Sequence, residues 1–237
     1  MADARQALAE MRKAPHPLVR PVIVLGGYLD PGFATLALEN AVRQSTGDDR
    51  IITVNYAMAG SFDECRKEVI AATDRAFACD DPSQTTEVDV VAVSMGGLVA
   101  RYAACQLPDQ PRRLRIVRVF TIATPHLGAE MADLPTLNPL QQDMRRGSAF
   151  LNRLNAEQLA CELVSYVRVQ DPIVGEEQSA PPGDTPRWVP NAPLSLAHGL
   201  AHDDPRIQAD ILRRLRGQTP FTTDPPAPLP PAGLNAR

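Results

Sequence analysis

The most informative segment of the chain is Val88-Asp89-Val90-Val91-Ala92-Val93-Ser94-Met95-Gly96-Gly97. Four valines within six residues predict a buried strand, and residues 95–106 have the pattern of a helix that stops before Pro108. Ser94 stands at the junction. Its neighbours two positions away, Ala92 and Gly96, are small, as a sharp turn between a strand and a helix requires. The segment predicts a central strand that passes directly into a helix.

Similar patterns recur on both sides of this segment. Four further apolar runs predict strands, at residues 22–25, 50–56, 116–122 and 163–169. Two further helices have clear start signals. One has a capping box at Ser61 and Glu64 and reaches about Cys79; the other has a cap at Asp204 followed by Pro205, and Gly217 follows its end. Strands that alternate with helices predict an α/β fold, with a mostly parallel sheet covered by helices on both faces.

The chain is expected to contain one main domain. We assign residues 1–20 to an N-terminal helix and lead-in, and residues 21–217 to the α/β domain. Residues 126–160 interrupt the alternation and are expected to form a small cap or lid insertion over the top of the sheet. Residues 218–237 are rich in proline and predict a disordered tail.

Composition argues against several classes of protein. The chain has 24 Lys and Arg against 28 Asp and Glu, a net charge of −4, which is unlike a nucleic-acid-binding protein. No window approaches the roughly 18 consecutive apolar residues of a membrane span, so stable membrane insertion is not expected. The first residues lack the apolar stretch of a secretory signal, which predicts a cytoplasmic protein.

The turn at Ser94 resembles the nucleophile elbow of the α/β-hydrolase superfamily, and the chain as a whole is similar to bacterial lipases and esterases in it. The resemblance covers residues 20–216 and implies that Ser94 is a catalytic nucleophile. Alanine replaces the first glycine of the usual motif, at Ala92. The alternative interpretation is that Ser94 only caps the helix that begins at Met95.

The resemblance also implies an oxyanion hole. Leu25-Gly26-Gly27-Tyr28 follows the first strand, where members of the family often have His-Gly in place of Gly26-Gly27. The family's backbone donors then correspond to the N–H groups of Tyr28 and Met95. Two alternatives remain at this point: a glycine turn without a catalytic role, and a substrate pocket shaped by the Tyr28 ring.

The remaining catalytic residues follow from the family's chain order of serine, acid and histidine. Asp171, at the end of the strand over residues 163–169, corresponds to the acid; the alternatives are a plain turn residue there and Asp184 as a weaker second candidate. Two histidines precede the last helix. His198 has the more suitable spacing and is the favoured base, whereas His202 is the alternative base and could instead bond the start of that helix.

A last motif follows the strand over residues 116–122. Thr124-Pro125-His126-Leu127-Gly128 resembles the Thr-Pro-His-x-Gly segment of lipase-like hydrolases. Because the family's base lies near the C-terminus, His126 is expected to have a structural or pocket-lining role, and we assign His126 and Leu127 to the substrate pocket.

Taken together, the resemblance implies a serine hydrolase that cleaves carboxylic esters through a Ser-His-Asp triad and an acyl-enzyme, with no metal and no cofactor. The expected partner is a small-molecule ester with an apolar acyl group. Two alternatives stay open: an acyltransferase or thioesterase on the same triad, and a non-catalytic binding module with a hydrolase-like fold. The sequence leaves the oligomeric state open.

Overall fold

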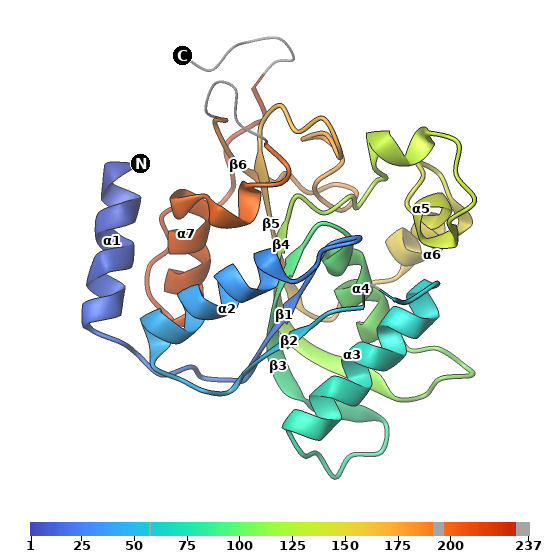
Figure 1. Cartoon of the computed structure of the whole chain (residues 1–237), viewed down its shortest axis with the longest axis horizontal. Helices are drawn as coiled ribbons and strands as arrows, with labels where there is room; N and C mark the ends of the chain where they lie inside the picture. The colour runs from blue at the N-terminus through green and yellow to red at the C-terminus, as the bar shows by residue number, and fades with distance from the viewer. Residues whose placement is uncertain (57, 192–196, 231–237) are drawn as a thin grey trace.

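Six parallel strands form one sheet, in the order β2-β1-β3-β4-β5-β6 (Figure 1). The computed structural model describes residues 1–56, 58–191 and 197–230. The strands are β1 (Val22–Leu25), β2 (Ile51–Val54), β3 (Gln84–Val93), β4 (Arg113–Ile122), β5 (Glu162–Arg168) and β6 (Arg187–Val189). The helices are α1 (Ala2–Lys13), α2 (Phe33–Thr46), α3 (Phe62–Ala76), α4 (Met95–Ala104), α5 (Pro139–Asp143), α6 (Ala149–Ala156) and α7 (Pro205–Leu215), with short 3₁₀ segments at Glu130–Asp133 and Ala201–Asp203.

The strand β3 lies inside the sheet, between β1 and β4, as its run of valines predicts. Leu25 of β1 is in register with Ala92, which is in turn in register with Thr121 of β4. The last six residues of β3 are all buried. Such a strand is covered on both faces, which is the arrangement expected for a parallel sheet. The predicted α/β class and mostly parallel sheet are therefore confirmed.

Helices cover both faces of the sheet and enclose two separate cores. Val22 and Val24 face a core shared with α1, α2 and α7, whereas Ile23 and Leu25 face a second core shared with α3, α4, α5 and α6. The two groups of helices lie on opposite sides of the sheet in Figure 1. Because successive strand residues point to opposite faces, a stretch of strand that is covered on both faces is apolar at nearly every position, and this explains the short continuous apolar runs of the sequence.

Two of the predicted helix starts have the expected caps. The Ser61 hydroxyl accepts the N–H of Glu64 at 3.2 Å, while a Glu64 carboxylate oxygen accepts the N–H of Gly60 at 2.7 Å. Asp204 accepts the N–H of Arg206 at 3.0 Å at the start of α7. These bonds satisfy backbone donors that the first turn of a helix leaves without partners.

One arginine joins the first helix to the last. Arg216, just after α7, donates to the carbonyl oxygens of Met11 at 3.1 Å, Ser45 at 3.0 Å and Ala14 at 2.7 Å. The side chain is buried, so these carbonyls replace its lost hydration. The ends of α1, α2 and α7 are thus held by a single guanidinium.

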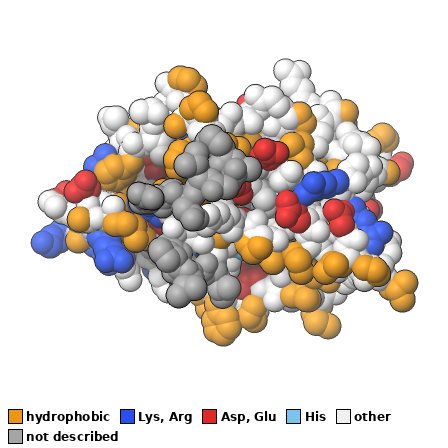
Figure 2. Space-filling model, turned by 90° about the horizontal axis from the view of Figure 1, so that it is seen from above, with side chains coloured by type: hydrophobic (Ala, Val, Ile, Leu, Met, Phe, Trp, Pro, Cys, Tyr) orange, Lys and Arg blue, Asp and Glu red, His pale blue; other side chains and the backbone are white. Residues whose placement is uncertain are grey.

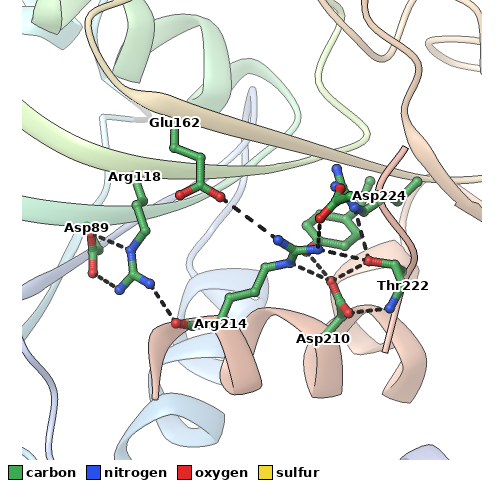
Figure 3. A network of polar contacts seen from close by, with 9 residues as sticks. Asp89, Arg118, Glu162, Asp210, Arg214, Thr222 and Asp224 are labelled. Carbon is green, nitrogen blue, oxygen red and sulfur yellow. Dashed lines mark hydrogen bonds and ion pairs between the residues drawn. The ribbon is translucent and has the colours of Figure 1, made fainter. Parts of the chain in front are cut away.

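A second polar network holds the start of the Pro-rich tail (Figure 3). Asp210 of α7 is fully buried and accepts bonds from the Tyr166 hydroxyl at 2.6 Å, the Arg214 guanidinium at 2.9 Å and the Thr222 N–H at 2.8 Å. Arg214 also contacts Asp224 at 3.7 Å. The first part of the tail therefore has defined contacts, and residues 231–237, for which disorder was also predicted, lie outside the described residues.

Candidate active site

Ser94 occupies a strained turn at the end of β3. Its backbone angles, φ 52° and ψ −125°, lie in a region that residues other than glycine rarely adopt. Two bonds from the end of β4 hold it there: the Ser94 N–H donates to the Ile122 carbonyl at 2.8 Å, and the Thr124 hydroxyl donates to the Ser94 carbonyl at 2.8 Å. The half-exposed side chain is therefore presented at the top of the sheet by a fixed backbone.

The two glycines after Ser94 are required by close packing. A Cβ at Gly96 would lie 2.6 Å from the carbonyl oxygen of Gly26 and 2.8 Å from that of Leu25. A Cβ at Gly97 would lie 2.3 Å from the hydroxyl oxygen of Thr124. The small residue expected at Gly96 therefore has a physical cause: α4 begins directly against the end of β1.

The Ser94 side chain is one end of a chain of hydrogen bonds. Its Oγ lies 3.1 Å from Nε2 of His198, and Nδ1 of His198 lies 2.8 Å from Oδ2 of Asp171. The other carboxylate oxygen of Asp171 accepts the N–H groups of Ile173 at 2.9 Å and Val174 at 3.1 Å. Asp171 is buried at the end of β5, so the carboxylate is fixed by the backbone and in turn fixes the imidazole.

The structure separates these residues from the alternatives. It places Asp171 against His198, whereas the N–H of Asp184 belongs to a turn with Pro181. His202 lies in the 3₁₀ segment before α7, and its Nε2 is 3.5 Å from its neighbour Asp203. Of the two late histidines, the structure therefore brings His198 to Ser94.

His126 lies inside the protein. Its Nδ1 is 3.0 Å from the Arg101 guanidinium and its Nε2 is 3.1 Å from the Thr121 hydroxyl, and the residue is fully buried. Burial and the neighbouring charge of Arg101 lower the pKa of His126 well below its usual value. A neutral, buried ring favours a structural role. That His126 and its half-buried neighbour Leu127 line a substrate pocket stays a prediction.

The loop after β1 packs directly against Ser94. The Cβ position of Gly27 would lie 3.2 Å from Cβ and 3.8 Å from Oγ of Ser94. The carbonyl of Gly26 accepts the hydroxyl of Tyr56, a residue at the end of β2 whose buried ring has a raised pKa and so remains a donor. Tyr28 follows in this loop, and Met95 opens α4, where N–H groups have no partner within the helix. This arrangement is compatible with the predicted oxyanion hole at Tyr28 and Met95.

Sequence reasoning did not identify Tyr56 as part of this site. The sequence placed Tyr56 only at the end of the strand predicted over residues 50–56. Its hydroxyl reaches the loop because β2 pairs with β1 in register, from Val22 with Ile51 to Leu25 with Val54. The useful signal would have been a buried polar ring at the carboxyl end of a strand, where parallel-sheet proteins place their sites.

The insertion at 126–160 lies beside the loop that carries Asp171. Leu127 donates its N–H to the Gln178 carbonyl at 3.2 Å, and Met131 donates to the Ile173 carbonyl at 3.2 Å. The insertion thus borders the acid's loop at the carboxyl edge of the sheet, and its movement as a lid stays a prediction.

A cavity at the opposite edge of the sheet is separate from this site. Its volume is about 740 Å³, and its lining includes the first residues of three strands, Gln84, Arg113 and Glu162. Within the described ranges, no group of three or more His, Cys, Asp or Glu residues could hold a metal ion. In the same part of the chain, no helix is long and apolar enough to cross a bilayer.

Comparison with known proteins bears on the fold and on the class of reaction. The sequence family described as "Putative serine esterase (DUF676)" matches residues 61–163, which include Ser94 but neither Asp171 nor His198. The comparison with curated proteins finds no match.

Solved structures of lipases and esterases share the fold. Lipase BlEst2 from Bacillus licheniformis, in its mature form, is 14% identical with a TM-score of 0.56, over 81% of this chain and 91% of that one. The metagenomic carboxyl esterase MGS0156 is 13% identical with a TM-score of 0.55, over 86% and 77%.

Phospholipase PlaB from Legionella pneumophila is 14% identical with a TM-score of 0.50, over 68% of this chain; the match spans only 45% of the phospholipase. At such identities the structural matches show a common fold. The chain therefore has the α/β fold of these lipases and esterases and, over residues 61–163, matches a family of serine esterases.

Proposed function

We propose that this protein is a serine hydrolase that cleaves carboxylic esters, with Ser94 as nucleophile, His198 as base and Asp171 as the orienting acid. The observation that carries the proposal is the continuous chain of contacts from Ser94 Oγ to His198 Nε2 at 3.1 Å and from His198 Nδ1 to Asp171 Oδ2 at 2.8 Å. The serine esterase family match supports the reaction type.

The first half of the reaction forms an acyl-enzyme. Nε2 of His198 takes the Ser94 hydroxyl proton as Oγ attacks the ester carbonyl carbon. Asp171 holds the proton on Nδ1 and stabilises the imidazolium that forms. The N–H groups of Tyr28 and Met95 donate to the oxyanion. The proton on Nε2 then passes to the leaving alcohol as the carbon–oxygen bond of the ester breaks.

The second half returns the enzyme to its starting state. A water molecule gives a proton to Nε2 of His198 and attacks the acyl carbon. The bond to Ser94 Oγ then breaks, Oγ recovers the proton, and the carboxylic acid leaves. No step requires a group outside these side chains and backbone amides. The acyl group is expected to be apolar and to contact the insertion next to Leu127.

The proposal is tested with p-nitrophenyl esters of increasing acyl length and with a fluorophosphonate probe. Ser94→Ala should abolish labelling and lower kcat by about 10,000-fold or more, because the nucleophile is lost. His198→Ala should lower kcat to a similar extent. His202→Ala is the matched control, since it removes a histidine four residues away, and it should leave most activity.

Two results would contradict the proposal. Equal hydrolysis by wild type and Ser94→Ala would exclude Ser94 as the nucleophile. A deeper loss with His202→Ala than with His198→Ala would exclude His198 as the base. Alcohol or thiol acceptors added during turnover distinguish hydrolysis from acyl transfer, because both draw on the same acyl-enzyme.

A further inference from the structure

The Pro-rich tail crosses the outer edge of the sheet. Within the described residues, β6 is the last strand in the sheet order and pairs with β5 alone. Arg187 and Trp188 are successive residues of β6, so they point to opposite faces. Nε of Arg187 donates to the Thr222 hydroxyl at 3.0 Å, and the Trp188 indole N–H donates to the carbonyl oxygens of Ala227 at 3.2 Å and Pro228 at 2.9 Å. The tail therefore passes around β6 from one face of the sheet to the other.

The first contact of the tail with β6 is electrostatic (Figure 3). Arg187 pairs with the Asp224 carboxylate, and Arg214 lies 3.7 Å from the same carboxylate. Burial and the neighbouring charge of Arg214 lower the pKa of Arg187 below its usual value. In the part of the chain that the structure describes, Arg187 forms an ion pair with Asp224 alone, whereas Arg214 also pairs with Asp210 and Glu162. The position of Asp224 therefore favours an acidic residue.

The second contact has the chemistry of proline-rich peptide recognition. Residues 225–228 read Pro-Pro-Ala-Pro, and residues 226–230 form neither helix nor strand. A proline-rich segment is kept extended by its own rings and makes no hydrogen bonds within itself, so its carbonyl groups are free to accept. The Trp188 indole donates to two of these carbonyls and places an aromatic ring beside them, as in proteins that bind such segments.

The tail lies on the surface rather than in a core. Asp224, Pro225, Ala227 and Pro228 are all exposed. Hollows of about 350 Å³ beside Pro225 and about 240 Å³ beside Trp188 flank the segment. Figure 2 views the molecule from the end at which the tail lies and shows hydrophobic side chains, the class that includes proline, exposed across that face. A segment held in this way can leave without opening the protein's interior.

The surface that receives the tail is built by the sheet. β6 pairs with β5 in parallel register, Tyr166 with Arg187 and Val167 with Trp188. The next residue, Val189, is buried in the core shared with α1, α2 and α7. These contacts do not involve residues 224–230, so Arg187 and Trp188 keep their places when that segment is absent.

The same strand adjoins the candidate triad on two sides. The Val189 carbonyl accepts the N–H of Val169 at 3.1 Å, and Asp171 follows Val169 by two positions. Along the chain, His198 follows Val189 by nine positions. A shift of β6 would therefore move the segments that carry both the acid and the base.

We infer that Arg187 and Trp188 form a binding site for an extended segment in which an acidic residue precedes prolines, and that residues 224–228 occupy this site as a ligand supplied by the chain itself. Occupation of the site steadies β6 and, through it, the segments of Asp171 and His198. The binding half stands on the contacts alone, and only the second half rests on the proposed function. A protein that binds the proline-rich tail would empty the site and lower the activity.

Trp188 is the only tryptophan of the chain, so its fluorescence reports occupation directly. Removing residues 224–237 empties the site but keeps both bonds from Thr222 to Asp210. The emission of Trp188 should then shift to the red and be quenched more strongly by acrylamide. Removing residues 231–237 is the matched control, because it keeps the whole segment that contacts β6, and it should leave the emission unchanged.

A synthetic peptide of residues 224–230 should bind the chain that lacks residues 224–237 and reverse the shift. A ligand on a short flexible tether has an effective concentration on the order of 1 mM, so a tail that stays bound implies a Kd for the free peptide below about 1 mM. Asp224→Asn in the peptide removes the charge and should raise the Kd about tenfold or more. The same substitution in the complete chain, where nothing is truncated, should shift the emission in the same direction.

Ester hydrolysis tests the second half of the inference. Removal of residues 224–237 should lower kcat for a p-nitrophenyl ester by about 2- to 30-fold, the range by which residues outside a site change their coupling to it. Addition of the peptide should restore kcat. A truncation that had merely unfolded the protein would not be rescued by a peptide, so this step separates positioning from stability.

Unchanged emission after removal of residues 224–237, or equal binding of the two peptides, would overturn the binding site. An unchanged kcat on removal of the same residues would overturn its coupling to the triad. A dimer of the complete chain in sedimentation velocity that the truncated chain lacks would show that the tail occupies a second copy instead of its own. Absence of hydrolysis by the complete chain would refute the proposed function and the coupling with it, while the binding result stands.

Discussion

Gly96→Ala tests whether close contact between α4 and the end of β1 positions the nucleophile. The new methyl group would lie 2.6 Å from the Gly26 carbonyl oxygen and 2.8 Å from the Leu25 carbonyl oxygen, whereas ordinary contacts begin at 3.4 Å. The two backbones must therefore separate by about 0.8 Å. Both neighbours are main-chain atoms of buried residues, so no side chain can turn aside to relieve the clash.

The size of the effect follows from this displacement. Overpacking of a core costs about 1–3 kcal/mol, which corresponds to a Tm lowered by about 2–12 °C in a protein of this length. The moved segment leads into Gly27, which packs against Ser94. A displacement of nearly 1 Å near reacting groups lowers the rate by about 10- to 100-fold. We therefore expect kcat/KM for a p-nitrophenyl ester to fall by that factor.

Thermal unfolding and ester hydrolysis are measured together, with Gly60→Ala as the control. Gly60 is exposed and has no positive φ, and its Cβ would meet only a Glu64 carboxylate oxygen at 3.7 Å. This control should change the free energy of unfolding by no more than about 0.5 kcal/mol. If Gly96→Ala matches Gly60→Ala in both Tm and kcat/KM, the contact does not position the nucleophile.

Three further perturbations have defined outcomes. Asp171→Asn keeps an oxygen acceptor for the two backbone N–H groups but presents an amide to the imidazole. We therefore expect kcat to fall about 1,000- to 10,000-fold with little change in Tm. A loss of kcat below tenfold would contradict the role of Asp171. The pKa of His126 is lowered in the folded protein, so below pH about 6.5 the unfolded chain binds a proton that the folded chain does not, and stability falls with falling pH. His126→Gln should flatten this dependence between about pH 6.5 and 5 in denaturant titrations, and an unchanged slope would contradict the assignment. Deleting residues 218–237 removes two bonds that Thr222 donates to the buried Asp210 carboxylate, at 2.8 and 3.0 Å. The deletion should lower the free energy of unfolding by about 2–5 kcal/mol. An unchanged denaturation midpoint would show that the polar network around Asp210 is dispensable for stability.

Local patterns predicted the parts of the fold that depend on neighbouring residues. The valines before Ser94 predicted a buried strand because every position of β3 near its end faces a core. Ser61 and Asp204 predicted helix starts because the backbone N–H groups that their side chains accept lie within three residues along the chain. Strand and helix ends differed by a few residues, as with β3, which begins at Gln84, ahead of the valine-rich segment that starts at Val88.

Elements with weak local signals were missed. The helix α2 begins after Gly32, at φ 108°, without a side-chain cap, and β6 has only three residues. In the candidate site, chain order and local setting predicted Ser94, Asp171 and His198 separately. Their contact depends on three different strands reaching one edge of the sheet. The roles of Tyr56 and Gly97 depend on the distance between segments far apart in the chain, which periodicity does not encode.

The guanidinium of Arg216 has a consequence for the order in which the chain folds. Its bond to Met11 joins residues 205 positions apart, so α1 depends on an anchor that is synthesised long after the helix itself. Contacts of such separation form late, because they close a long loop of chain. Until then the apolar face of α1, with Leu8 and Met11, has no α7 to pack on. Nascent chains that stop short of Arg216 should therefore expose this helix to chaperones.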